Sequence, residues 1–222
     1  ELCAETGFAR STTSRLLAAL ERSALIGRDA TGTWVPGQLF ASYAARRGDD
    51  DDLVRVAMPA MEELGELSGE TVNLGVPRAG TVVHVGQVAA TYMLASRDWV
   101  GVEVPPHLSA LGKVLYAAHA LELPDGPLEH PTPAAARTAA DLRTQLAGIR
   151  SRGYAVTIDE LEVGLTGIAA PVFDGATAVA ALGLSGPTAR LASQADTLGP
   201  VVARLAGRLS SQITRHRKDG AA

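Results

Sequence analysis

Three stretches of the 222-residue chain join small residues and hydroxyls at predicted strand ends or helix starts. They cover residues 101–118, 153–174 and 181–190. In the first, Ser109-Ala110-Leu111-Gly112 opens a predicted helix, whose free N–H groups and dipole favour an anion. The alternative is a plain capped helix in which Ser109 is the N-cap.

Other reactive side chains lie in weaker patterns. His84 and His107 could bind a metal, but the sequence has no C-x-x-C or H-x-x-x-H pair, so we expect no metal and no cofactor. Asp159 and Glu160 could form an acid/base pair, but neighbouring strand residues point to opposite faces. A solvated loop or a salt bridge to an arginine suits them better. Ser185 lacks the G-x-S-x-G pattern of a nucleophile, so we expect no enzyme.

The elements that must position these residues follow an order typical of an α+β domain. Short β-type runs occupy residues 71–76, 81–88, 91–96 and 99–104, and helices are predicted at 110–120 and 134–152. Further strands are predicted at 154–158, 167–174 and 178–186, before a last helix at 193–216. This order predicts a largely antiparallel sheet flanked by helices.

The N-terminal residues 6–26 predict a turn followed by one amphipathic helix that begins near Ala9. On a helical wheel, one stripe that we expect to be buried holds Thr13, Leu16, Leu17 and Leu20. The opposite face holds Ser11, Ser14, Arg15 and Ala18. Hydroxyls and an arginine near a helix N-terminus suit the DNA major groove. The alternative is an ordinary surface helix.

A small hairpin is predicted directly after this helix, because the turn signal at 30–33 separates two short apolar runs. A hairpin in that position is the wing of a winged helix, with Arg28 at its base; the alternative is a surface hairpin that ends the domain. We expect DNA contacts from the following residues: Arg10, Ser11, Thr12, Ser14, Arg15 and Arg28.

The charge distribution is compatible with this interpretation. Residues 1–48 hold six arginines and four acids (+2), and the remainder holds 14 basic residues and 20 acids (−6), for a net charge of −4. A slightly basic first segment on an acidic body fits local DNA contact by a small module rather than coating of nucleic acid.

The predicted domains are residues 1–37 (a winged helix-turn-helix), 38–52 (a linker helix and acidic boundary) and 53–217 (a larger α+β domain). Four aspartates at 49–52 mark a solvated boundary, and a second long helix with Pro59 is expected from Leu53 to Gly69. The chain starts at Glu1 without Met, so we expect the first helix of the DNA-binding motif to lie upstream.

The composition indicates a cytoplasmic protein. One cysteine, Cys3, excludes an internal disulfide, which favours a reducing compartment. No apolar run approaches the roughly 20 residues that a membrane span needs, so we expect no membrane partner.

The sequence resembles the IclR family of bacterial transcriptional regulators over nearly its whole length. AETGFARSTTSRLL at 4–17 matches the family's helix-turn-helix, and residues 105–113 match a P-x-H-x-x-A-x-GK segment. RGY at 152–154, followed by acids and then IAAPVFD at 168–174, matches a third motif, and SGP at 185–187 matches a fourth. Four motifs in order at suitable spacing are a specific signal.

The resemblance implies a winged-helix DNA-binding domain and a GAF-like effector domain in a homodimer or homotetramer. Family members bind small metabolites, often organic or aromatic acids. Carried over residue by residue, the ligand positions fall on His107, Ala110, Leu111, Leu165, Gly167, Gly183 and Ser185. Ala110 and Leu111 N–H groups would hold a carboxylate, and Ser185 would donate its hydroxyl.

The chain also departs from the family pattern. Gly167 and Gly183 replace larger or polar residues of members that grip small oxoacids, which suggests a roomier cavity and a larger ligand. Ala9 leaves the recognition helix without an obvious N-cap, and Thr13 replaces a usual Val or Ile.

From the motifs and the resemblance together, we expect a one-component regulator whose effector changes its binding to double-stranded operator DNA. The alternative is a small-molecule sensor or enzyme with a degenerate winged helix.

Overall fold

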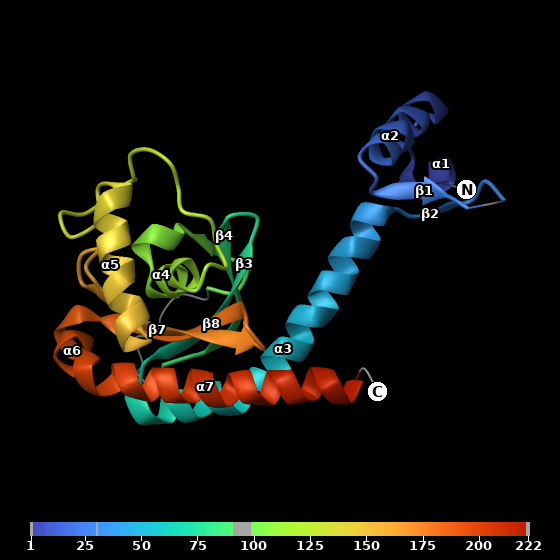
Figure 1. The fold of residues 1–222 in the computed structure, drawn as a ribbon. Coiled ribbons are helices and arrows are strands. Elements are labelled where there is room, and N and C mark those ends of the chain that lie inside the picture. Colours follow the sequence, from blue (N-terminus) through green and yellow to red (C-terminus); the bar gives the residue numbers. More distant parts are fainter. Residues whose placement is uncertain (1, 30, 91–98, 221–222) are drawn as a thin grey trace. The chain divides into compact units, whose positions relative to one another are not determined.

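The computed structural model describes residues 2–29, 31–90 and 99–220. The chain divides into two compact units, residues 1–52 and residues 53–222 (Figure 1). Each unit has its own sheet, of two strands in the first and six in the second.

The N-terminal unit consists of two helices and a hairpin. Helix α1 (Leu2–Thr6) ends before Gly7, which has a φ of +70°, and helix α2 (Arg10–Arg22) follows. Strands β1 (Ile26–Arg28) and β2 (Trp34–Pro36) pair antiparallel. The Asp29 carboxylate accepts the N–H groups of Thr31 and Thr33 at 2.9 Å each, and the Thr31 hydroxyl also donates to it. These bonds hold the pKa of Asp29 below its usual value. The unit thus contains both the predicted helix and the predicted hairpin of the wing.

The prediction that one stripe of α2 is buried is wrong, because no residue of this helix is buried. Leu16 is 47% exposed and Leu20 is 39% exposed, while Thr13 and Leu17 are half-buried. Within the described part of the unit, α2 can pack only on the short α1, the hairpin and the start of α3. These elements offer too little surface to bury a whole helical face.

The linker and the second long helix form one element, which corrects the sequence-based expectation of two. Helix α3 (Gln38–Ser68) runs for 31 residues, with the four aspartates and Pro59 inside it. Asp49, Asp51 and Asp52 are exposed. A run of like charges opposes burial, but it is compatible with a helix whose charged side chains remain in water.

A six-stranded antiparallel sheet with the order β5-β4-β3-β8-β7-β6 forms the centre of the second unit. Its strands are β3 (Thr71–Arg78), β4 (Thr81–Val88), β5 (Glu103–Val104), β6 (Ala155–Ile158), β7 (Leu165–Asp174) and β8 (Thr177–Pro187). The helical elements of this unit after α3 are η1 (Pro106–Leu108), α4 (Ala110–Ala117), α5 (Ala139–Arg152), α6 (Thr188–Leu191), η2 (Ala192–Gln194) and α7 (Ala195–Gly220). The unit is the predicted α+β, GAF-like domain.

Some predicted boundaries differ from the structure. The run 99–104 forms a strand only at its end, because Gly101 (φ +79°) and a bond from the Val102 N–H to the Trp99 carbonyl make a turn. The predicted strand at 91–96 lies outside the described residues. Helix α5 begins five residues later than predicted, because Thr138 and Asp141 form a capping box there.

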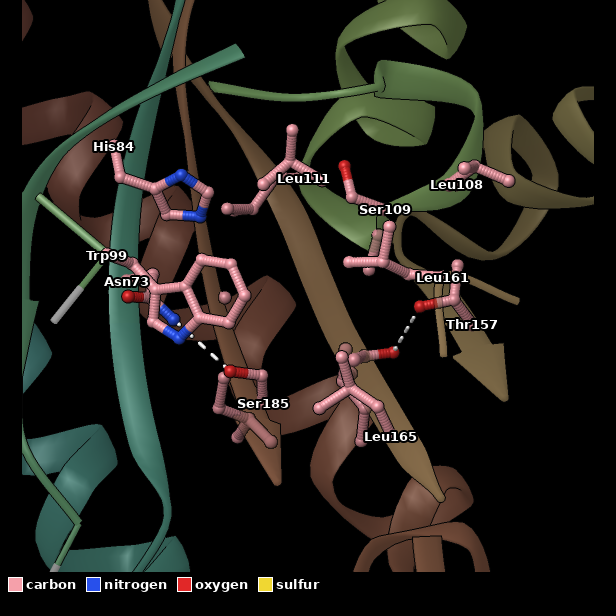
Figure 2. A pocket seen from close by; sticks show the side chains of 16 residues that line it. Asn73, His84, Trp99, Leu108, Ser109, Leu111, Thr157, Leu161, Leu165 and Ser185 are labelled. Carbon is pink, nitrogen blue, oxygen red and sulfur yellow. Dashed lines mark hydrogen bonds between the residues drawn. The ribbon is translucent and has the colours of Figure 1, made fainter. Parts of the chain in front are cut away.

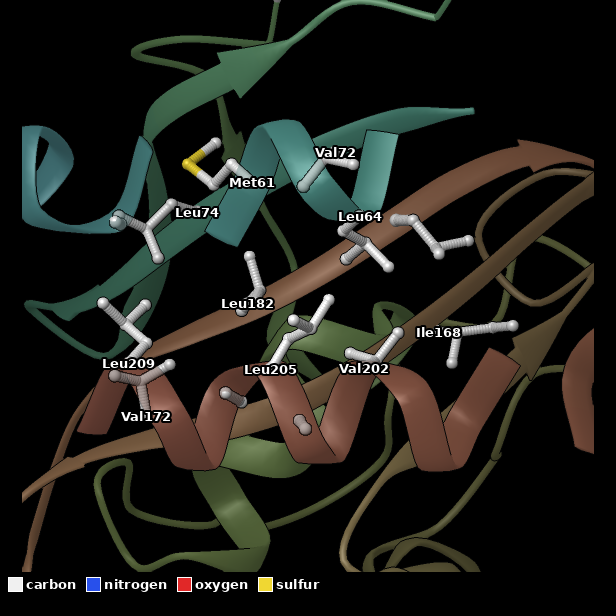
Figure 3. Packing of buried hydrophobic residues seen from close by; sticks show 14 of the residues in the cluster. Met61, Leu64, Val72, Leu74, Ile168, Val172, Leu182, Val202, Leu205 and Leu209 are labelled. Carbon is white, nitrogen blue, oxygen red and sulfur yellow. The ribbon is translucent and has the colours of Figure 1, made fainter. Parts of the chain in front are cut away.

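Helices cover both faces of this sheet. On one face, α7 and the second half of α3 contribute Met61, Leu64, Val202, Leu205 and Leu209 to a core with β3, β7 and β8 (Figure 3). On the other face, α4 and α5 pack a second core against Val82, Ala155, Ala169 and Ala181. The second face also carries the cavity described next.

Candidate functional site

A cavity lies between the N-terminal end of α4 and the sheet (Figure 2). It is lined by Asn73, His84, Trp99, Val104, Leu108, Ser109, Ala110, Leu111, Thr157, Leu161, Leu165, Gly167, Ile168, Gly183, Leu184 and Ser185. The cavity volume open to the centre of a water-sized sphere is about 60 Å³. This is several times the volume that one water needs. None of these side chains is a carboxylate, lysine or arginine, so the cavity suits a small and largely apolar molecule.

The strand register brings the polar groups of the sheet together. Gly167 of β7 lies between Thr157 of β6 and Ser185 of β8 in one cross-strand row. In a neighbouring row, Gly183 of β8 pairs with Asn73 of β3. Residues directly opposite on paired strands share a face, so these side chains all point to the α4 side.

The start of α4 forms the opposite wall. The Ser109 hydroxyl accepts the Gly112 N–H at 3.0 Å, so Ser109 is the N-cap, as the plain alternative predicted. A Cβ on Gly112 would lie 2.2 Å from the Pro106 carbonyl oxygen, so only glycine allows this approach to η1. The first-turn N–H groups of Ala110 and Leu111 precede the capped one, at the positive end of the helix.

Asn73 is buried at the edge of the cavity. Its Nδ2 donates to the Ser185 hydroxyl at 3.3 Å, and its side chain lines the cavity with Oδ1 buried and unpartnered. Figure 2 shows this bond between β3 and β8. A buried acceptor without a protein partner costs folding free energy.

His84 and Trp99 complete this side of the cavity. Burial lowers the pKa of His84, so its imidazole is neutral near pH 7. Nδ1 lies 3.1 Å from the Val102 carbonyl oxygen, which can only accept, so Nδ1 carries the ring proton. The imidazole and indole centroids are 5.9 Å apart.

The two glycines do not make the cavity roomier, which corrects that expectation. A Cβ on Gly183 would lie 2.7 Å from the Ile168 carbonyl oxygen and 3.1 Å from a Leu111 methyl group. A Cβ on Gly167 would lie 3.0 Å from the Thr157 hydroxyl. These glycines let α4 approach the sheet closely instead of leaving open space.

Six of the seven predicted effector residues line the cavity, and His107 does not. The cavity brings together Ala110, Leu111, Leu165, Gly167, Gly183 and Ser185. The His107 Nε2 instead lies 2.7 Å from the Glu129 carbonyl oxygen, so its ring faces the loop before α5. Asn73, Trp99 and Thr157 also line the cavity and were not predicted, because their only local signal is a polar or aromatic residue within a predicted strand.

A buried ion pair lies next to the cavity. Lys113 of α4 forms a hydrogen-bonded salt bridge with Glu160, and its Nζ also donates to the Gln145 side chain at 2.6 Å. Burial lowers the pKa of Lys113 and raises that of Glu160. The pair ties α4 to the loop that carries Leu161, so it positions two parts of the cavity lining.

Asp159 and Glu160 therefore act separately and not as an acid/base pair. Asp159 accepts the Thr188 hydroxyl at 2.6 Å and the Gly164 N–H at 2.8 Å, which lowers its pKa. The prediction of a salt bridge to an arginine is wrong for Glu160, because its salt-bridge partner is Lys113.

The predicted DNA-contacting residues lie on α2 and β1 of the other unit. Arg10, Ser11, Thr12, Ser14, Arg15 and Arg28 are all exposed. Ala9 provides no side-chain cap for α2, as expected. The Arg28 guanidinium stacks 3.9 Å from the centre of the Trp34 ring and donates to the Gly32 carbonyl at 3.3 Å. Arg28 is thus held against its own wing.

Across residues 2–29, 31–90 and 99–220, no group of three potential metal ligands comes together. In the same part of the chain, none of the helices is both long and apolar enough to span a bilayer.

Comparisons with known proteins agree with this architecture. Residues 48–211 match the family model for the C-terminal region of the bacterial transcriptional regulator IclR. The chain is 34% identical over 189 residues to the HTH-type transcriptional repressor AllR of Escherichia coli K12. The aligned region covers 82% of this chain and 69% of AllR. AllR of Salmonella typhi is 34% identical over 188 residues, with the same coverage.

Solved structures show the same fold at lower identity. Thermotoga maritima IclR superposes with a TM-score of 0.67 at 21% identity, over 96% of this chain and 89% of that one. An IclR homolog from Microbacterium hydrocarbonoxydans, complexed with 4-hydroxybenzoate, superposes with a TM-score of 0.70 at 22% identity, over 95% and 88%. On the family match and the AllR relatives, this chain belongs to the IclR family of bacterial transcriptional regulators.

Proposed function

We propose that the N-terminal unit binds double-stranded operator DNA and that a small organic acid in the cavity modulates this binding. The observation that carries the proposal is the cavity itself, which joins the start of α4 to polar groups from β3, β6 and β8. The AllR relatives are named transcriptional repressors, which supports the same role.

On the DNA side, α2 would lie in the major groove with the wing beside it. The exposed face of α2 carries Ser11, Ser14 and Arg15, and its first turn has no acid. Hydroxyls, N–H groups and an arginine at a helix N-terminus can contact phosphates and guanine. Arg28 on the wing would reach the neighbouring backbone or minor groove.

On the effector side, the first turn of α4 would hold a carboxylate through the N–H groups of Ala110 and Leu111. Among the lining residues that the structure describes, none is a lysine or arginine, so the helix start is the strongest positive group that they offer. The complex of the Microbacterium homolog with 4-hydroxybenzoate supports an organic acid of this size.

Binding at the cavity would act on DNA affinity across a homodimer or homotetramer. Only an effector with different affinities for two arrangements of the winged helices could change operator binding. Light scattering of the 222-residue chain, with and without effector, would give the oligomeric state.

Two measurements on the full-length protein test the proposal. In fluorescence anisotropy, a DNA fragment from upstream of the protein's own gene should bind more tightly than a scrambled fragment, with an affinity that falls as salt rises. In a thermal-shift screen, small organic acids that bind the folded state should raise the Tm. Absence of sequence-selective, salt-sensitive binding would leave a sensor or enzyme with a degenerate winged helix.

A further inference from the structure

The loop between β6 and β7, residues 159–164, separates the cavity from solvent. Leu161 is half-buried and lines the cavity (Figure 2), whereas Glu162, Val163 and Gly164 are exposed. A single layer of chain therefore lies between cavity and water here. Leu161 also belongs to no helix or strand, whereas most of the lining comes from α4 and the strands of the sheet.

Both ends of this loop are anchored to the start of α6. The Asp159 carboxylate accepts the Gly164 N–H at 2.8 Å and the Thr188 hydroxyl at 2.6 Å. The Gly164 carbonyl in turn accepts the Thr188 N–H at 2.8 Å. Asp159 and Gly164 have φ values of +59° and +92°, so the chain turns sharply at each end. These contacts fix the positions where the loop leaves and rejoins the sheet.

The residue before Leu161 is anchored as well. Glu160 forms the buried salt bridge with Lys113, and its carbonyl accepts the Thr132 hydroxyl at 3.0 Å. The tip of the loop, residues 161–163, carries instead a longer bond, in which the Leu165 N–H donates to the Glu162 carbonyl at 3.2 Å. Since movement of the tip breaks no ion pair, it costs less free energy than movement of the whole loop.

We propose that the tip 161–163 is the gate of the cavity and that the Leu161 side chain closes it. An outward turn of the tip opens the cavity to solvent, while the anchors at 159, 160 and 164 keep the rest of the wall in place. The closed leucine excludes water and encloses a bound molecule. This inference rests on the proposed effector role of the cavity, to which it adds a route of entry and release.

A thiol on the cavity wall can measure this gate without an effector. Thr157 lines the cavity and is 5% exposed, and a cysteine is close to it in size. Iodoacetamide is small and uncharged, so its rate of reaction at Thr157→Cys follows the population of open cavity. Val202→Cys, on α7 in the core on the other face of the sheet, reports global unfolding because Val202 is fully buried.

The experiment measures alkylation of Thr157→Cys in the full-length protein, with its native cysteines, Cys3 among them, replaced by serine. Adding Leu161→Ala should raise the rate roughly tenfold, because the truncation removes the side chain that closes the cavity. Val163→Ala is the matched control on the same tip and should leave the rate unchanged, because Val163 is 71% exposed and does not line the cavity. Leu161→Met keeps the volume of the gate and should keep the rate near that of the parent.

The rate at Val202→Cys separates gating from unfolding and should not rise with Leu161→Ala. The proposal is wrong if Leu161→Ala raises alkylation at Thr157→Cys no more than it does at Val202→Cys. It is also wrong if Val163→Ala raises the rate at Thr157→Cys as much as Leu161→Ala does. Alkylation of the parent Thr157→Cys at the rate of the unfolded chain would overturn it too, because the cavity would then be open without movement of the gate.

These rates depend on neither operator nor effector. Absence of sequence-selective operator binding by the wild-type protein would count against the proposed function and leave the rates as they are. Alkylation that is independent of Leu161 would count against this inference alone.

Discussion

The two units of the chain differ most in how they hold their functional side chains. Among the residues of the first unit whose exposure is described (2–29, 31–40 and 48–52), Gly37 alone is buried, and Ser11, Ser14 and Arg15 on the polar face of α2 are exposed. In the second unit, the cavity lies beside two cores, and its polar residues Asn73 and His84 are almost fully buried.

This difference fits the partners that we propose for each unit. Phosphates and base edges come from outside, so the proposed DNA-contacting side chains would stay exposed until binding. A small effector must be enclosed, so the residues proposed to hold it are fixed in advance by strand register and by the packing of α4. Substitutions should therefore affect stability in the second unit and mainly binding in the first.

The largest effect is expected at Lys113. Lys113→Met removes the salt-bridge partner of the Glu160 carboxylate, which is 8% exposed, and should lower the free energy of unfolding by about 3–5 kcal/mol. Chemical denaturation of the variant and wild type measures this loss. Lys113→Met combined with Glu160→Leu should restore most of it, because it removes the unpaired charge.

The pH dependence of Lys113→Met gives an internal check. Burial raises the pKa of Glu160 above its unfolded value, and the variant lacks the lysine that opposes this effect. A carboxyl with a raised folded-state pKa favours folding fully below its unfolded pKa and loses that contribution as pH rises through the folded-state pKa. The deficit should thus be larger at pH 8 than at pH 5, and a deficit independent of pH would contradict a buried carboxylate.

The next effect is expected where α4 approaches η1. Gly112→Ala places a Cβ within 2.2 Å of the Pro106 carbonyl oxygen, so backbone must move, at a cost of about 1–3 kcal/mol. The displaced α4 should also weaken binding of any acid that raises the Tm of the wild type. Gly148→Ala on α5, where a Cβ would meet nothing within 4 Å, is the control: it should raise the free energy of unfolding by up to about 1 kcal/mol, because alanine favours the helix, and leave acid binding unchanged.

A pair of substitutions then separates the two units. Arg15→Ala should weaken operator binding roughly tenfold and reduce the salt slope by about one, since an exposed cation on the DNA face is lost. Its Tm and effector binding should not change. Ser185→Ala should do the reverse, and Arg143→Ala, an exposed arginine on α5, should leave operator affinity intact. Equal loss of both activities in Arg15→Ala would contradict the division.

Local patterns were enough to predict most elements. Helix α2, the wing, the N-cap at Ser109 and the end of α5 at Gly153 depend on residues close in the sequence. Family motifs then pointed to six residues of the cavity. The helix through residues 49–52 was missed, because a solvated charge run looks the same at a boundary and inside an exposed helix.

The remaining parts of the site depend on pairings between distant segments. Asn73 reaches the cavity because β3 pairs with β8 in a register that sets it opposite Gly183, 110 residues later. A shift of one residue would turn Asn73 into the core, and no local pattern sets that register. The same holds for Lys113 and Glu160, whose contact joins residues 47 positions apart.

The smallest effect is expected at Leu16, and this substitution can break the comparison most directly. Leu16→Ala removes a side chain that is 47% exposed, so the free energy of unfolding should change by less than about 0.5 kcal/mol. Leu205→Ala, the same truncation in the fully buried core of the second unit, should cost about 2–5 kcal/mol. Denaturation of both variants, with the transition of each unit followed separately, makes the measurement. A cost above about 2 kcal/mol for Leu16→Ala would mean that something outside the described residues covers α2 in solution, because only removal of a buried side chain is that expensive. A cost that falls on dilution would identify the covering partner as another copy of the chain.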